Sequence, residues 1–154
     1  MTTELIIEQW KQVITTQMHF NDMLMQLRAI GISVIMASYG GAAIAFVQYK
    51  NTFVCISGKR IRPSTMVILF TMLIILALFA LDYCYYFQML LTAVEVGNQM
   101  ELNPAILFDL TRQISSDISP SSAKYILMFL YGAPFLVGII LLVSQQFATI
   151  ESSV

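Results

Sequence analysis

The sequence predicts an all-α integral membrane protein with three transmembrane helices, an N-terminal amphipathic helix and a helical segment between spans two and three. Hydrophobic residues make up 58% of the 154 residues and charged residues 11%. The mean hydropathy of +0.76 is too high for an ordinary soluble domain of this length. Three uncharged apolar runs are each long enough to cross a bilayer core.

Residues 1–28 predict an amphipathic helix with a heptad seam. The seam residues recur at alternating spacings of four and three and are Ile6, Trp10, Val13, Gln17, Phe20, Leu24 and Leu27. Such a seam requires a partner helix and predicts an oligomer, in which the polar Gln17 fixes register and copy number. The alternative is a helix lying flat on the membrane, but its few basic residues, Lys11 and Arg28, argue against that.

Residues 29–48 predict the first transmembrane helix, because Ala29 to Val47 contains no charge. No Pro separates this span from the preceding segment, so we expect one long helix. A small-residue stripe recurs every four residues and consists of Ser33, Ala37, Gly41 and Ala45. Small side chains on one helix face allow a second backbone to approach closely, so we expect a helix-packing surface here.

Residues 49–65 predict a basic loop with four basic residues and no acid, in which Ser57-Gly58 makes a turn and Pro63 starts the next helix. Residues 66–86 predict the second transmembrane helix, with Asp82 near one membrane interface beside several tyrosines. Two cysteines on either side of this span predict no disulfide.

Residues 87–122 predict an extramembrane helical segment, in which Asn103-Pro104 begins a new helix. Residues 123–147 predict the third transmembrane helix, with Gly132, Pro134 and Gly138 as kink and close-approach positions, and 148–154 a polar tail. Segments 3–28 and 83–118 are expected on the same side, where their apolar faces can pack together. An alternative with four spans treats 83–97 as a re-entrant piece, but Glu95 and the polar residues after it argue against this.

We expect no enzymatic activity, cofactor or metal site, because the chain has one histidine and no recognisable phosphate loop or acid pair. His19, Asn21 and Asp22 fall off the seam and form either a solvated polar patch or a ligand-sensing or proton-sensing site. Asp82, Glu95 and Glu101 are candidate acids at a pore mouth, or are simply solvated at the interface. Four basic residues on each side of the predicted spans leave the membrane orientation open.

The segments QMHFND (17–22) and DYCYYFQMLLTAVE (82–95) resemble short helical motifs in small bacterial membrane effectors of anti-phage systems, the Hailong type above all. The chain departs from that motif by having Phe87-Gln88 in place of a Tyr-His pair. The resemblance implies an oligomeric pore or membrane-disrupting effector, paired with a nucleotidyltransferase and silent until an extramembrane signal acts on its soluble helices.

Together, these observations predict a homo-oligomeric effector in the bacterial inner membrane that contacts lipid and responds to a regulatory partner or a nucleotide or oligonucleotide signal. The alternative is a non-conducting accessory or scaffold subunit, whose stripe and seam dock a different membrane protein.

Overall fold

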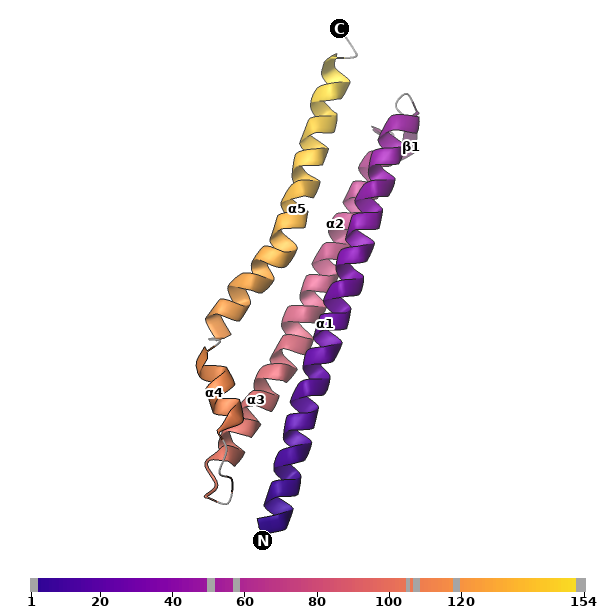
Figure 1. Ribbon diagram of the computed structural model, residues 1–154. Helices are drawn as coiled ribbons and strands as arrows, with labels where there is room; N and C mark the ends of the chain where they lie inside the picture. Colours follow the sequence, from indigo (N-terminus) through magenta and orange to yellow (C-terminus); the bar gives the residue numbers. More distant parts are fainter. Residues whose placement is uncertain are drawn as a thin grey trace. The chain divides into compact units, whose positions relative to one another are not determined.

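The computed structural model describes residues 3–49, 52–56, 59–104, 106, 109–117 and 120–151. In chain order its elements are α1 (Thr3–Gln48), β1 (Val54–Ile56), β2 (Lys59–Ile61), α2 (Pro63–Leu81), η1 (Asp82–Tyr86), α3 (Phe87–Glu101), α4 (Leu110–Asp117) and α5 (Pro120–Glu151) (Figure 1). In these described ranges three helical stretches are long and apolar enough to cross a membrane, namely Thr3–Gln48, Pro63–Glu101 and Ser121–Gln145. The prediction of a helical chain with three membrane-capable helices is confirmed.

The predicted lead-in and first span form one continuous helix, α1, of 46 residues. At 1.5 Å per residue, α1 is about 69 Å long. A bilayer hydrocarbon core is only about 30 Å thick. Roughly half of the length of α1 therefore extends beyond a core of that thickness.

The second membrane-capable stretch, Pro63–Glu101, runs through α2, η1 and α3 over 39 residues. It begins at Pro63, as the sequence predicts, because a proline at the first helical position loses no intrahelical hydrogen bond. The predicted continuation of the helix beyond the second span is confirmed. The re-entrant alternative for 83–97 is wrong, because the helix passes through these residues without a break.

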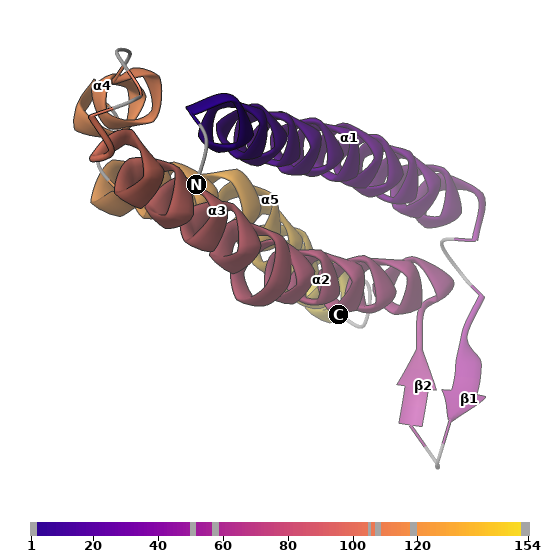
Figure 2. The same ribbon diagram turned by 90° about the horizontal axis from the view of Figure 1, so that it is seen from below.

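The predicted basic loop contains a short antiparallel hairpin between β1 and β2 (Figure 2). Val54 pairs with Ile61, and Cys55 pairs with Arg60. These strands were not predicted from the sequence, because each has only three residues. The predicted turn at Ser57-Gly58 lies outside the described residues.

The prediction that Asn103-Pro104 begins a helix is wrong. These residues lie in a turn in which the Ile106 backbone N–H donates to the Asn103 carbonyl at 2.9 Å. α4 begins only at Leu110. At the other end of the chain, α5 continues to Glu151 and takes in part of the predicted polar tail.

The chain forms two compact units. Unit 1 comprises Met1–Arg28 and Ala80–Met128, and unit 2 comprises Ala29–Phe79 and Phe129–Val154. In unit 2 the most deeply buried side chains come from α1, α2 and α5 and include Ile35, Ala42, Ile68, Thr71, Ile75 and Tyr131. Tyr131 also meets Phe79 edge-on, with 5.8 Å between ring centroids.

Gly138 of α5 is a close-approach position in unit 2, as the sequence predicts. A Cβ added there would lie 2.7 Å from the Tyr39 hydroxyl oxygen and 2.9 Å from Met72 Cγ. The same hydroxyl donates a 2.7 Å hydrogen bond to the carbonyl of Pro134. Gly132 is different, because an added Cβ there meets nothing within 4 Å.

We expect Gly138→Ala to destabilise the protein by about 1–3 kcal/mol, the usual effect of adding a methyl group where neighbouring atoms leave no room. Gly132→Ala on the same helix is the matched control and is expected to be neutral or stabilising, since alanine favours helix more than glycine. Thermal unfolding of both variants in detergent micelles measures the difference. Equal stability of the two variants would contradict the close approach at Gly138.

Candidate functional site

The heptad seam of α1 packs within the chain, against η1 and α3 of unit 1. Leu24 is buried, at 1% exposure, and the other seam residues are half-buried, namely Ile6, Trp10, Val13, Gln17, Phe20 and Leu27. The prediction that the seam requires a partner helix is confirmed, as is the packing of the two extramembrane pieces on each other. The structure accounts for the seam without a second copy, because α3 supplies the partner.

Three polar contacts fix how α1 and the η1–α3 helix align. Trp10 Nε1 donates to Glu101 Oε1 at 3.3 Å, and Gln17 Nε2 donates to the Ala93 carbonyl at 2.9 Å. Arg28 donates to both carboxylate oxygens of Asp82, at 2.7 Å from Nε and 3.0 Å from Nη2. The residue numbers on α1 increase from one contact to the next, and the residue numbers of their partners decrease by nearly the same amount. All three contacts therefore belong to one antiparallel register.

Gln17 has a different role from the one predicted. Its amide hydrogen bond to Ala93 lies beside Gly97, where an added Cβ would collide with the Gln17 amide nitrogen. The glycine therefore makes room for the polar side chain at the helix contact. Gln17 does fix a register, as a polar seam residue is expected to do, but the register is that of two helices of one chain.

The Arg28–Asp82 ion pair lies where α2 passes into the π-helical turn η1. The Asp82 side chain is 0% exposed and that of Arg28 is 26% exposed. The two-pronged contact suits the planar guanidinium, which matches both oxygens of a carboxylate. The expectation that Asp82 offers negative charge at a pore mouth is wrong for this structure, because the carboxylate is buried and its charge is balanced.

Glu101 also departs from its expected place at a pore mouth. It is only 6% exposed, and its carboxylate accepts hydrogen bonds from the backbone N–H groups of Thr111 at 2.8 Å and Arg112 at 3.0 Å. These N–H groups lie in the first turn of α4, where no intrahelical acceptor is available. A carboxylate there also interacts favourably with the helix dipole. Together with its bond to Trp10, Glu101 joins α1, α3 and α4.

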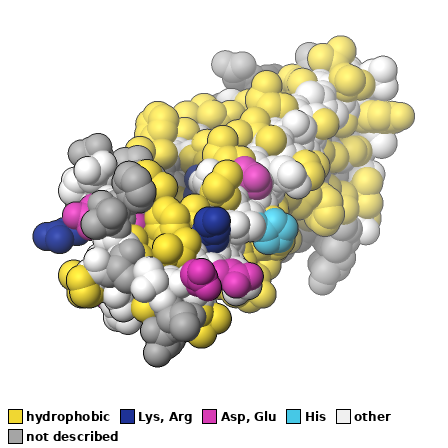
Figure 3. All heavy atoms as spheres, turned by 60° about the horizontal axis from the view of Figure 1, so that its bottom comes forward, with side chains coloured by type: hydrophobic (Ala, Val, Ile, Leu, Met, Phe, Trp, Pro, Cys, Tyr) yellow, Lys and Arg dark blue, Asp and Glu magenta, His cyan; other side chains and the backbone are white. Residues whose placement is uncertain are grey.

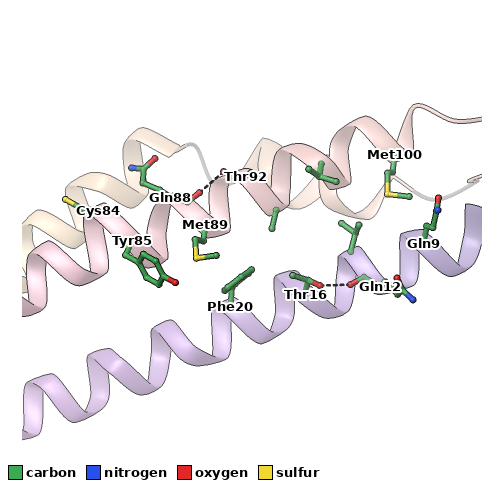
Figure 4. A pocket seen from close by; sticks show the side chains of 13 residues that line it. Gln9, Gln12, Thr16, Phe20, Cys84, Tyr85, Gln88, Met89, Thr92 and Met100 are labelled. Atoms are coloured by element: carbon green, nitrogen blue, oxygen red, sulfur yellow. Dashed lines mark hydrogen bonds between the residues drawn. The ribbon is translucent and has the colours of Figure 1, made fainter.

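An open groove of about 700 Å³ lies between α1 and the η1–α3 helix of unit 1. In Figure 4, Phe20 points from α1 toward Tyr85 and Met89 on the facing helix. α1 contributes Gln9, Gln12, Val13, Thr16 and Phe20 to the lining, and the facing helix contributes Cys84, Tyr85, Gln88, Met89, Thr92, Ala93, Val96 and Met100. Among the described residues that line the groove, none is charged.

The chemistry of the groove suits binding by apolar contact. The Thr16 and Thr92 hydroxyls donate to backbone carbonyls of their own helices, Gln12 and Gln88, at 2.9 and 3.0 Å (Figure 4). These two donors are therefore already used within the chain. Methionine and aromatic side chains provide an adaptable apolar surface, and the glutamine amides supply a few hydrogen-bonding groups.

The remaining predicted site residues are exposed. His19, Asn21 and Asp22 lie at the surface of α1, outside the groove. Glu95 is exposed and accepts a 3.2 Å hydrogen bond from Gln99. Within the described residues, no group of three or more His, Cys, Asp or Glu side chains is placed to hold a metal ion. The free cysteines Cys55 and Cys84 are both exposed.

The small-residue stripe faces away from the chain's own helices. Ser33, Ala37 and Gly41 are exposed and Ala45 is half-buried, whereas the buried positions of α1 in unit 2 are Gly31, Ile35 and Ala42. A Cβ added at Gly41 meets nothing within 4 Å. Large apolar side chains are exposed as well, and Figure 3 shows hydrophobic atoms covering much of the visible face, with charged groups scattered among them.

Sequence reasoning missed the partners of Asp82 and Glu101. Arg28 directly precedes the first predicted span and Asp82 lies near the end of the second, so opposite charges at the same end of two antiparallel spans were a usable signal. No comparable signal marked Glu101. The backbone N–H groups that donate to its carboxylate belong to Thr111 and Arg112, ten and eleven residues further along the chain.

No family model matches this chain, and no curated protein or solved structure matches it either.

We expect the two members of the ion pair to respond unequally to substitution. Arg28→Met leaves a fully buried carboxylate without its guanidinium, and breaking a buried pair in this way costs about 3–5 kcal/mol. Asp82→Asn should cost less, because Arg28 is partly exposed and can turn toward water. The free energy of unfolding in micelles measures both effects.

Glu95→Gln, a change at an exposed acid, is the control, and its free energy of unfolding should stay within about 0.5 kcal/mol of that of the unmodified protein. Equal losses for Arg28→Met and Asp82→Asn would refute the asymmetry.

Proposed function

We propose that this protein is an oligomeric membrane effector whose subunits form a gated pore, and that it acts in bacterial anti-phage defence. The observation that carries the proposal is the small-residue stripe of α1. It lies on a helix long and apolar enough to cross a membrane, yet the chain's own helices leave most of it uncovered. Close backbone approach along such a stripe is a common basis of helix association in membranes.

The proposed gate is the α1–α3 contact of unit 1. Arg28 immediately precedes Ala29, so a change at the ion pair acts directly on the start of the apolar part of α1. The groove beside this contact provides a place where a signal can bind and alter it. A ligand shifts such an equilibrium only by as much as it prefers one conformation over the other.

The setting of the proposal comes from the resemblance of residues 17–22 and 82–95 to Hailong-type membrane effectors. It implies a location in the bacterial inner membrane and an activating or silencing signal from a regulatory partner or a nucleotide. The two segments lie next to each other in the fold, because Gln17 contacts α3 and Phe20 lines the groove with Tyr85 and Met89.

The alternative of a non-conducting accessory subunit uses the same exposed stripe to dock a different membrane protein. The two functions differ in what the purified chain does alone. A pore-forming chain assembles with itself into a ring of four or more copies, and an accessory chain stays a monomer or dimer.

We expect Gly41→Leu to break the assembly while leaving membrane insertion intact, because the new side chain fills the space that a second backbone needs. Mass photometry in detergent should show smaller species, with association weakened by about tenfold or more, which corresponds to about 1.4 kcal/mol. Ala43→Leu is the matched control, since Ala43 is exposed on the side of α1 away from the stripe.

Conductance separates the two functions. Planar-bilayer recordings of the unmodified protein and of Arg28→Met should show currents, larger in the variant if the ion pair holds the gate shut, and Gly41→Leu should abolish them. A monomeric or dimeric unmodified protein without currents in either form would exclude the pore and favour the accessory subunit.

A further inference from the structure

The charges of unit 2 are almost all positive. Between residues 29 and 79 the sequence has four basic residues and no acid, and the only acid of the whole unit is Glu151, whose side chain lies outside the described part of the chain. All four basic residues fall, in sequence, in the connection between α1 and α2. Residues 29–79 therefore offer these four residues no acidic partner of their own.

Arg62 is enclosed by the fold, whereas Arg60 is exposed. It lies between β2 and α2, is 8% exposed, and its Nε and Nη1 atoms are buried without a hydrogen-bond partner. A buried guanidinium with unused donors is costly, because burial removes the water that would otherwise bind it. A partner from another molecule would offset this cost.

The neighbours of Arg62 shape a site for an anion. Its guanidinium carbon lies 5.7 Å from the centroid of the Phe53 ring, which covers the face of the group and leaves the donors at its edge. Phe53 is 43% exposed, so its ring can move aside without disturbing a core. Arg60 is exposed and two residues before Arg62, which places both arginines on the same side of an extended segment.

We propose that the hairpin base, made by Phe53, Arg60 and Arg62, binds a phosphate group, supplied by the headgroup of an anionic phospholipid. Guanidinium groups bind phosphate oxygens through two parallel hydrogen bonds, and a pair of arginines neutralises its charge. Arg62 directly precedes the first residue of a membrane-capable helix, the level at which headgroups meet such helices. The proposal does not depend on pore formation.

The test uses the full-length protein in detergent micelles with three separate additions at constant ionic strength, namely phosphatidylglycerol, phosphatidylcholine or inorganic phosphate. The thermal unfolding midpoint is followed, and native mass spectrometry counts retained lipids. Phosphatidylglycerol should raise the midpoint and be retained, and phosphatidylcholine should do so much less. Arg62→Gln should weaken the apparent affinity for phosphatidylglycerol about fivefold, the loss expected for one basic residue at a membrane surface.

Two further variants keep the test decisive. Arg112→Gln removes an exposed cation of unit 1 and should leave the response unchanged. If Arg62→Gln does not fold, Arg62→Lys retains the charge but loses the two-pronged donor geometry, and Arg60→Gln removes the exposed arginine. Each should weaken retention of phosphatidylglycerol.

The outcomes divide cleanly. An equal response to inorganic phosphate supports the phosphate site and makes free phosphate its source. Equal responses to phosphatidylglycerol and phosphatidylcholine, or equal losses in the Arg62 and Arg112 variants, overturn the proposal.

Discussion

The ion pair between Arg28 and Asp82 is the interaction on which the packing of unit 1 depends. A fully buried carboxylate is tolerated only with a well-placed partner, so α1 has to bring its guanidinium against η1. This requirement fixes how far α1 can slide along α3. Once the register is set, Gln17 reaches the Ala93 carbonyl and Trp10 reaches Glu101 further along the same helices. The groove lined by Phe20 and Met89 is a consequence of the same register.

Unit 2 is held together by a different kind of contact. Small residues and polar uncharged groups make contacts between its helices, as where Gly138 meets Tyr39, and where Thr65 donates a 2.7 Å hydrogen bond to Gln145. These contacts join apolar helices without placing an ionised group among them. Such a design suits helices in a medium where apolar side chains gain little by packing on one another and close approach with hydrogen bonding decides association. The charged pair is confined to unit 1.

The sequence was sufficient to predict the helices but not their partners. Length and hydropathy predicted the three membrane-capable helices, and the seam from Ile6 to Leu27 correctly indicated a helix–helix contact. Periodicity indicates which face of a helix packs, but not what packs on it: the seam contacts α3 of the same chain, and its role in an oligomer stays a prediction. The turn at Asn103 was misread because its Asn-Pro pair is equally compatible with a turn and with a helix start. The burial of Asp82 and Arg62 depends on contacts between distant residues, which no local pattern records.

The pairing of Asp82 has a consequence for the proposed pore. With Asp82 balanced by Arg28 and Glu101 bound to α4, Glu95 is the one of the three candidate acids that remains exposed. A gate that opened by separating Arg28 from Asp82 would expose one positive and one negative charge per subunit, at neighbouring positions. Rings of both signs at nearly the same depth largely cancel beyond the screening distance of roughly 8 Å at physiological ionic strength. A pore gated at this pair would therefore discriminate weakly by the charge of the pair, and its selectivity would depend on its width and on the uncharged groups that line it.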